Sequence, residues 1–435
     1  MRVSAESLWR QRHFRTLWAA YSTSMVGSQV TLLALPLTAV LVLHASAAQM
    51  GLLTAAGTAP HLFVSLFAGV FVDRRRRRPI MIAADAGRAA LLLSVPVAAL
   101  AGRLKLPQLY VVALLTETLS VFYIVASSSL LPALVGRDRL LEGNGKLTAS
   151  FSAAQVAGPG LAGLLIQLVT APLAIVADAA SFVFSALAVG FGIRGAESAP
   201  APREQHVSVW REIGEGLRFV LGQPLLRATA CFTSTLNFFS TVIFTVLVLF
   251  ATRELGIEPA LLGLILAAGA IGSLTGALLA GRIARRLGVG GATAWGGTLT
   301  ALGCLCYPLA GGPRPIVIAV LLAGELLTGF AVVNLDINQV SLRQALTPER
   351  MLGRTGASGR FITWGVRPFG ALLAGWLGTA FGLRATLAVG AGGGLLAVLW
   401  LWLSPLPALR TLPAAAADTA SAARSPAEHA APPAA

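Results

Sequence analysis

Residues 51–74 read GLLTAAGTAPHLFVSLFAGVFVDR, and residues 263–286 read GLILAAGAIGSLTGALLAGRIARR; the two stretches align without a gap at an offset of 212. Ten positions are identical, although a composition rich in Ala, Gly and Leu inflates such a count. At the same offset, SLLPAL at residues 129–134 falls on SLRQAL at residues 341–346. Composition alone does not explain this second match, so we infer that the chain contains an internal duplication.

The composition indicates an integral membrane protein. Hydrophobic residues make up 56% of the chain, charged residues 12%, and the mean hydropathy is +0.76. A soluble chain usually carries about a quarter charged residues. A helix needs about 20 apolar residues to cross the hydrocarbon core of a bilayer, and runs of nearly that length recur along the chain. Unpaired backbone cannot face lipid, so these crossings are predicted to be helices.

The apolar runs predict an all-α membrane protein with about twelve transmembrane helices in two six-helix repeats. The predicted spans are 16–43, 50–72, 79–101, 108–134, 145–170, 172–193, 226–251, 259–281, 288–311, 315–341, 357–380 and 383–403. The predicted domains are an N-terminal bundle at 1–194, a linker at 195–224, a C-terminal bundle at 225–404 and a tail at 405–435. Helical spacing in residues 207–226 favours an interfacial helix in the linker, and the Ala/Pro/Ser-rich tail is expected to be disordered.

The distribution of basic residues predicts the orientation in the membrane. If the N-terminus is inside, only five basic residues fall on the outer side: Arg103, Lys105, Arg253, Arg314 and Arg384. This asymmetry is the positive-inside pattern, which places both termini in the cytoplasm. The net charge of +15 is therefore interpreted as a topology signal, and we expect no nucleic-acid partner.

The end of the second span carries the pattern GVFVDRRRRRP at residues 69–79. A glycine followed four residues later by Asp-Arg and then by a basic pair resembles the loop signature of the major facilitator superfamily. The resemblance implies a cytoplasmic gate, in which a carboxylate changes guanidinium partners as two domains rock, formed by Gly69, Asp73, Arg74, Arg77 and Arg78. Arg76 stands where the family usually has a glycine. A plain cytoplasmic anchor of five arginines is the alternative interpretation.

A second motif lies in the fifth span, where GPGLAG occupies residues 158–163. It resembles the core of a motif found in proton-coupled exporters of the same superfamily, which implies an antiporter-type helix with Gly158, Pro159 and Gly163 as its functional positions. Generic close packing of small residues is the alternative. The eleventh span repeats this character in RPFGALLAG at residues 367–375, with Arg367, Pro368 and Gly370 as counterparts.

Shorter stretches resemble one bacterial exporter branch of the superfamily, which includes macrolide-efflux and enterobactin-exporter proteins. These stretches are LPALV at 131–135, DAASF at 178–182, GLRF at 216–219 and TP at 347–348. The resemblance covers roughly residues 10–405. It implies a major facilitator fold that works by alternating access and exports its substrate.

Two carboxylates within predicted spans, Glu117 and Glu325, are candidates for binding protons or substrate. A charged side chain in the membrane is costly, so it normally faces a cavity or a partner. Shifted by 212, Glu117 falls at position 329, one helical turn from Glu325. We therefore expect both to line a central cavity, where competition between a proton and substrate would couple transport. The alternative is that each lies near the outer interface, neutral and hydrogen-bonded.

The other polar residues within the spans have weaker signals. Asp336 is a further candidate for protons or substrate, although its neighbours Asn334, Asn338 and Gln339 favour a polar cluster on the cytoplasmic side. Asp85 and Arg88, spaced i, i+3, are expected to pair with each other or with the arginine loop, in a structural or gating role.

Three more residues each have a functional and a structural interpretation. Arg360 and Arg367 could attract an anionic substrate, but snorkelling at a helix end explains them more simply. His61 could titrate, although a packed histidine is the favoured interpretation.

No motif of an enzyme or an ATPase is present. The chain lacks the Gly-x-x-x-x-Gly-Lys-Ser/Thr, His-Glu-x-x-His and Gly-x-Ser-x-Gly patterns, and its three cysteines lie in apolar runs. We expect no cofactor and no metal site, so an ion gradient or the substrate's own gradient must drive the protein.

The predicted function is that of a monomeric secondary transporter of the bacterial inner membrane. It would export amphipathic, antibiotic-like small molecules, with protons as the coupling ion. A dedicated exporter of a self-made siderophore or secondary metabolite is the alternative, and an intramembrane enzyme or a non-transporting membrane protein is the remote one.

Overall fold

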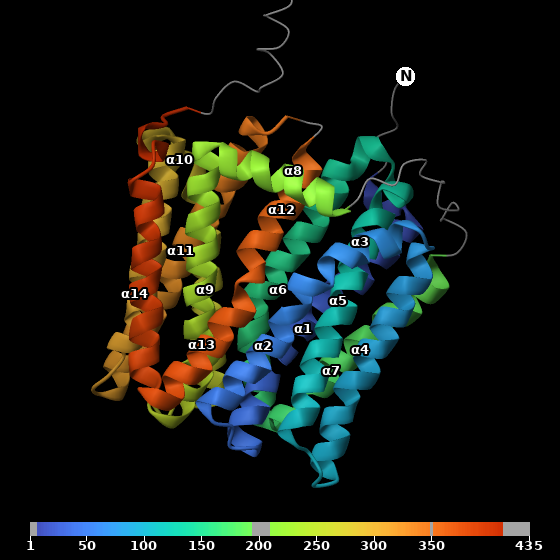
Figure 1. Cartoon of the computed structure of the whole chain (residues 1–435). Helices are drawn as coiled ribbons and strands as arrows, with labels where there is room; N and C mark the ends of the chain where they lie inside the picture. The colour runs from blue at the N-terminus through green and yellow to red at the C-terminus, as the bar shows by residue number, and fades with distance from the viewer. Residues whose placement is uncertain (1–6, 194–208, 349–350, 412–435) are drawn as a thin grey trace, which may run out of the picture.

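The computed structural model describes residues 7–193, 209–348 and 351–411, and this part of the chain contains helices and no strands (Figure 1). Residues 194–208 of the predicted linker and residues 412–435 of the predicted tail lie outside the described residues. The side chain of Asp73 also lies outside the described part, although its backbone ends a helix.

Within each half, helices follow one another with short connections. The N-terminal half consists of α1 (Arg12–Leu37), a π-helical extension (Thr38–Val42), α2 (Ala47–Phe63), α3 (Ser65–Asp73), α4 (Arg77–Leu100), α5 (Leu106–Val135), α6 (Leu140–Val169) and α7 (Ala171–Gly192). The C-terminal half consists of α9 (Pro224–Arg253), α10 (Pro259–Leu309), α11 (Arg314–Leu346), α12 (Leu352–Gly365), α13 (Arg367–Ala380) and α14 (Leu383–Trp402). The helix α8 (Val209–Gly222) connects them, and single 3-10 turns lie at Leu8–Arg10, Arg137–Arg139 and Leu406–Ala408.

The observed helices correspond to the twelve predicted spans. Among the described residues, nine helices are long and apolar enough to cross a membrane. The 51-residue α10 holds two of the predicted spans, because Gly288 adopts a φ of 76° that breaks the helical path. Two further spans are each formed by a pair of shorter helices, α2 with α3 and α12 with α13. The second break precedes Pro368, which has no N–H to donate to the carbonyl of Trp364.

The buried core shows how the two halves meet. One large cluster contains buried residues of both halves, among them Val40 and Ala47 from the first and Phe250 and Leu377 from the second. At the end that carries the N-terminus the core divides into two clusters. One is built around Tyr123 in the N-terminal half and the other around Phe232 in the C-terminal half. The halves are therefore packed together at the end opposite the termini and separate toward the termini.

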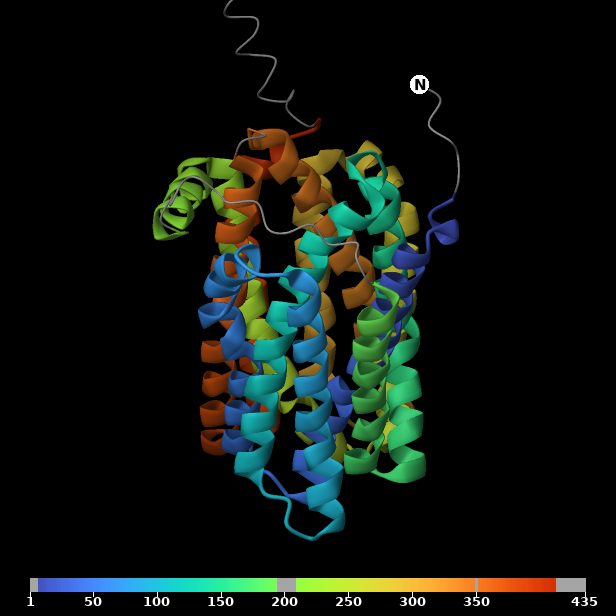
Figure 2. The same ribbon diagram turned by 90° about the vertical axis from the view of Figure 1, so that its right-hand side faces the viewer.

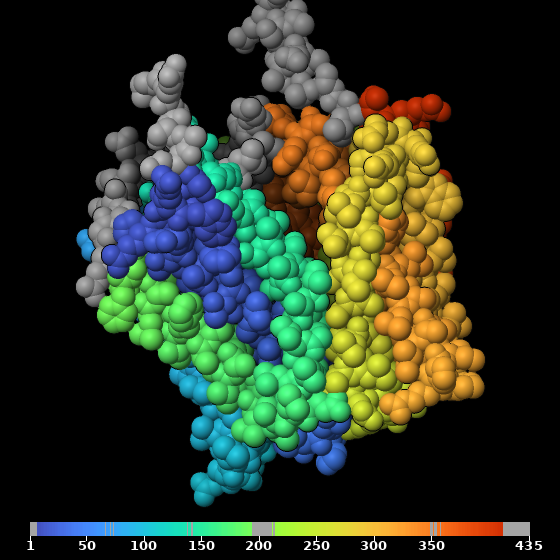
Figure 3. Space-filling view, turned by 180° about the vertical axis from the view of Figure 1, so that it is seen from behind, coloured from blue at the N-terminus to red at the C-terminus, as the bar shows by residue number. Residues whose placement is uncertain are grey.

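Glycines allow the closest contacts between the halves. A methyl group on Gly163 of α6 would lie 2.5 Å from the Pro259 carbonyl oxygen and 2.9 Å from Cα of Gly263 on α10. A methyl group on Gly51 of α2 would lie 2.8 Å from Cα of Gly375 on α13. Both pairs let helix backbones touch, as small residues do between membrane helices. In the space-filling view α6 and α10 meet along their lower part and diverge toward the termini, where α12 is visible between them (Figure 3).

The connecting helix α8 lies across the end of the bundle that also carries the N-terminus (Figures 1 and 2). It packs against α12 and α9 of the C-terminal half. This position keeps α8 out of the junction between the halves.

Candidate functional site

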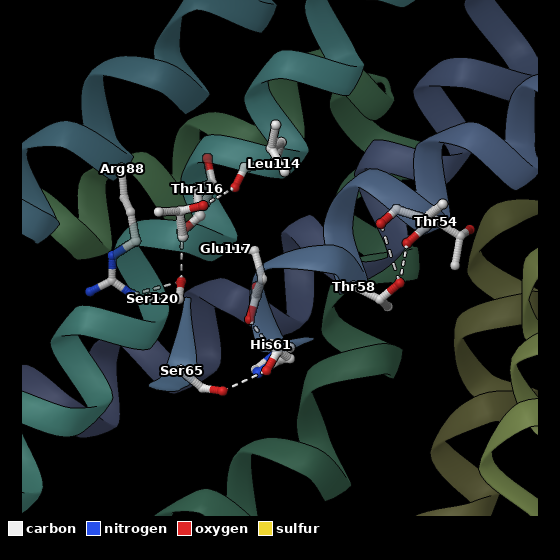
Figure 4. A network of polar contacts seen from close by, with 11 residues as sticks. Thr54, Thr58, His61, Ser65, Arg88, Leu114, Thr116, Glu117 and Ser120 are labelled. Atoms are coloured by element: carbon white, nitrogen blue, oxygen red, sulfur yellow. Dashed lines mark hydrogen bonds and ion pairs between the residues drawn. The ribbon is translucent and has the colours of Figure 1, made fainter. Parts of the chain in front are cut away.

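A carboxylate and an imidazole pair at the junction between the halves. Glu117 lies on α5 and His61 on α2, and Oε1 of the carboxylate is 2.8 Å from Nε2 of the ring (Figure 4). The side chains are 31% and 20% exposed, so the pair is reachable without being a surface feature. Inside a membrane protein such a pair satisfies the polar groups of both residues.

The C-terminal half supplies the other side of this site. The Trp364 ring, at the end of α12, packs edge-on against the His61 ring with 4.8 Å between centroids. The Arg367 guanidinium, at the start of α13, lies over the same indole at 4.5 Å. Asn237 of α9 accepts a hydrogen bond from Arg367 at 3.2 Å and donates one to the Thr363 carbonyl at 3.0 Å. A chain of contacts therefore runs from Glu117 of one half to Asn237 of the other.

His61 was expected to be a packed histidine, and its ring does pack, but it also pairs with Glu117. The sequence contained a signal for this role. Polar residues recur along α2 and into α3 with helical spacing, at Thr54, Thr58, His61 and Ser65. The hydroxyls of Thr58 and Ser65 donate to carbonyls of their own span, so His61 is the member of this row that reaches another helix (Figure 4). Arg367 likewise points into the protein and does not snorkel to a helix end.

Glu325 occupies a different environment from Glu117. It is 8% exposed and accepts a 2.8 Å hydrogen bond from the Tyr307 hydroxyl. Its other carboxylate oxygen faces Gly269, so α10 and α11 of the C-terminal half enclose it. The expectation that both glutamates line the space between the halves thus differs from the structure at Glu325, because its face of α11 turns toward α10.

Asp336 is exposed on α11, whereas Asn334 and Asn338 are buried. The Asn334 amide donates to the carbonyls of Gly276 and Phe330, and the Asn338 amide donates to the Asn334 carbonyl. Gln339 accepts a 3.0 Å hydrogen bond from Thr233 of α9. The amides therefore fasten α11 to its neighbours. The structure does not bring Asp336 to the Glu117–His61 pair.

The predicted gate residues lie at the end of α3 and the start of α4. Arg78 donates to the carbonyls of Val189, at 3.2 Å, and Gly190, both on α7 of the same half. Arg74 is exposed, and Arg77 is half-buried and has an interaction partner. A methyl group on Gly69 would meet no described atom within 4 Å, so no helix approaches it closely in this conformation. The role of these residues as a gate stays a prediction.

The glycine and proline motif of the fifth span lies on α6. Gly158 contacts Gln29 of α1, and Gly163 forms the crossing with α10 described above. The Pro159 carbonyl faces Gly263 on the same crossing. On the counterpart helix, Gly370 contacts the Phe238 carbonyl of α9 and Pro368 follows Arg367. Both stretches therefore hold helices close together.

An apolar groove lies beside the polar site. It has a volume of about 410 Å³ and is lined from α2, α5 and α13, including Leu62, Tyr110 and Phe369. Leu62 and Pro368 in its wall adjoin His61 and Arg367 in the chain. Apolar surface thus continues next to the charged groups.

The described residues contain no group of three or more His, Cys, Asp or Glu side chains that could hold a metal ion. Since the free cysteines Cys231, Cys304 and Cys306 are at least partly buried in helices, nothing in this part of the chain suggests a metal centre.

Comparisons with known proteins agree with this architecture. The chain is 31% identical over 380 residues to the multidrug efflux pump Tap of Mycolicibacterium fortuitum, covering 84% of this chain and 88% of that protein. It is 29% identical over 349 residues to the enterobactin exporter EntS of Escherichia coli, covering 78% and 79% of the two chains.

Among solved structures, a bacterial homologue of the iron transporter ferroportin in its inward-facing state has a TM-score of 0.73. It covers 92% of this chain and 99% of that chain at 18% identity, which bears on the fold alone. The outward-facing structure of such a homologue has a TM-score of 0.58. Residues 17–366 and 230–430 match the Major Facilitator Superfamily. The chain is a multi-pass membrane transporter and not an enzyme, and it belongs to the Major Facilitator Superfamily.

Proposed function

We propose that this protein exports amphipathic small molecules, of the kind that include antibiotics, in exchange for protons. The observation that carries the proposal is the Glu117–His61 pair, which meets Trp364 and Arg367 of the other half at the junction. Similarity to the multidrug efflux pump Tap supports the same substrate class.

In an alternating-access mechanism, the Glu117–His61 pair lies where the two halves separate and approach each other. The halves contact each other at one end through the Gly163–Gly263 and Gly51–Gly375 crossings and are separate at the other. When they rock, the Glu117 side of the junction must separate from, or approach, the Trp364 side. A proton bound there neutralises the carboxylate, whereas an ionised carboxylate is available to a polar group of the substrate. If the proton and the substrate bind at Glu117 in place of each other, export of the substrate is coupled to import of the proton.

The orientation and the assembly are part of the proposal. The positive-inside pattern supports a cytoplasmic position for both termini in a bacterial cell, with the end at which the two halves separate facing the cytoplasm. We also propose that the transporter acts as a monomer, because each chain contains both halves of the site.

Transport into inside-out vesicles tests this function. With the vesicle lumen acidified, addition of cationic and macrolide-like drugs should release protons from the lumen while the drug accumulates. Glu117→Gln should abolish drug-dependent proton release, because the amide cannot exchange a proton. Glu254→Gln, at the exposed end of α9, is the matched control and should transport normally. Proton release that survives in Glu117→Gln would refute the role of this carboxylate.

A dedicated exporter of a self-made siderophore or secondary metabolite is the second candidate, and similarity to EntS favours it. The same vesicles distinguish the two. If no drug of the panel evokes proton release from folded protein while a catecholate siderophore does, the dedicated exporter replaces the broad one.

A further inference from the structure

A second group of charged residues lies inside the N-terminal half. Asp85 and Arg88 project from α4 and Asp178 from α7, and their exposures are 0%, 2% and 1%. Charges so deep in a membrane bundle are costly and are retained where they have a task. None of the three takes part in the Glu117–His61 pair.

Arg88 occupies the centre of this group. Its guanidinium forms an ion pair with Asp85 and lies 4.0 Å from the Phe182 ring centroid and 4.6 Å from that of Tyr123. It also donates to the Ser120 hydroxyl at 3.3 Å. Two aromatic faces, a carboxylate and a hydroxyl thus fix its position.

Asp178 is the second carboxylate of the group. Ser181 lies 3.2 Å from its Oδ1, and Gly27 lets α1 approach so closely that a methyl group there would be 2.7 Å from the same oxygen. Thr31 of α1 faces it, and the charged groups that act on it are Arg88 and Asp85 from α4. Tyr123 of α5 is a titratable residue next to Arg88 and Asp85, and its hydroxyl oxygen lies 3.4 Å from the hydroxyl oxygen of Ser185.

The charges of this group do not balance. Two carboxylates face one guanidinium, in a core where an unpaired charge is strongly unfavourable. Among the described residues, Oδ2 of Asp85 and Nε of Arg88 have no hydrogen-bond partner. The hydroxyls of Ser181 and Thr31 that face Asp178 carry no charge, so no second cation in this part of the chain compensates the second carboxylate. One bound proton would make the group neutral. Asp85 is already engaged by Arg88, which leaves Asp178 as its carrier.

We propose that Asp85, Arg88 and Asp178 form a proton-binding site, in which Asp178 holds one exchangeable proton. Release breaks the O–H bond of the carboxylic acid and passes the proton to water, which leaves Asp178 ionised beside Arg88. Arg88 then divides its attraction between two carboxylates.

This site is connected to the junction between the halves. Ser120, which Arg88 contacts, lies one helical turn from Glu117 on α5, and Figure 4 shows Arg88, Ser120, Glu117 and His61 along this path. A change of charge at Asp178 therefore acts through Arg88 on the helix that carries Glu117. In transport, which rests on the proposed function, the site would hold a proton of the cycle separately from Glu117.

Infrared difference spectra of the purified full-length protein in lipid nanodiscs test the site without any substrate. Raising the pH should remove a carboxylic-acid C=O band and release protons, and both signals should fall by one group in Asp178→Asn. Glu117→Gln should keep the Asp178 band, so failure of the proposed transport function does not affect this result. Glu254→Gln is the matched control at an exposed carboxylate and should leave the band unchanged.

Stability provides a second readout. Asparagine imitates a protonated aspartate, so Asp178→Asn should fold with a melting temperature close to that of the wild type. Asp85→Asn removes the direct partner of Arg88 and should lower it. An unchanged band in Asp178→Asn would overturn the proposal, because Asp178 would then exchange no proton over this pH range. Loss of folding in this variant would also overturn it, because the fold would then require an ionised carboxylate at this position.

Discussion

Gly163 of α6 and Gly263 of α10 lie so close that a methyl group on either would be 2.9 Å from Cα of the other. The motif that carries Gly163 resembles one found in proton-coupled exporters, and in this conformation it forms part of the contact that closes one end of the junction. Gly160, one turn earlier, faces the same helix, but a methyl group there would meet Ala267 at an ordinary 3.7 Å.

This difference predicts the behaviour of two single alanine variants. Gly163→Ala should destabilise the closed contact by about 1–3 kcal/mol, the usual cost of overpacking, and shift the protein toward the state in which α6 and α10 separate. Distances between spin labels at positions 105 and 253, on opposite halves at that end, should lengthen. Gly160→Ala is the control and should match the wild type. Equal distances in both variants would contradict the assignment of Gly163 to the closing contact.

The fold was predictable because each span is a property of one segment. Length, hydropathy and Gly or Pro punctuation sufficed to predict twelve spans, including the boundary inside α10 at Gly288. The pairing of Glu117 with His61 was not predictable in this way, since it depends on how α2 and α5 are rotated about their axes. The offset of 212 also places Glu325 only near the position equivalent to Glu117. Gly329, which takes the equivalent position, also lies against Gly269 of α10, so the rotation of α11 about its axis turns this whole face toward α10 and away from the junction.

The Glu117–His61 pair predicts a specific effect of removing the imidazole. His61→Gln should lower drug export in vesicles about tenfold. The variant loses the imidazole that lies 2.8 Å from the Glu117 carboxylate, and the glutamine amide that replaces it cannot exchange a proton. Thr58→Val, one turn away, is the control, since the Thr58 hydroxyl donates only within α2. Similar export by the two variants would show that His61 is a packing residue.

Glu325 gives a test between a structural and a transport role. Tyr307→Phe removes the donor to a buried carboxylate and should cost about 1.5–3 kcal/mol of stability, visible as a lower melting temperature. Glu325→Gln keeps an oxygen that accepts the Tyr307 hydroxyl, so it should retain both stability and export. Should Glu325→Gln fold normally yet stop proton-coupled export, the carboxylate belongs to the coupling path after all.

Two variants in the arginine loop distinguish the effect on stability of the contact between Arg78 and α7 from the effect of the positive charge of the loop. Arg78 donates to two carbonyls at the end of α7, and Arg74 is exposed in the same loop. Arg78→Gln should lower the stability of the purified protein by about 1–3 kcal/mol, because it leaves those carbonyls without a charged donor. Arg74→Gln removes the same charge and should have little effect on the melting temperature. If both variants lose stability equally, the charge of the loop matters more than the contact with α7, and the interpretation as a plain cytoplasmic anchor is strengthened.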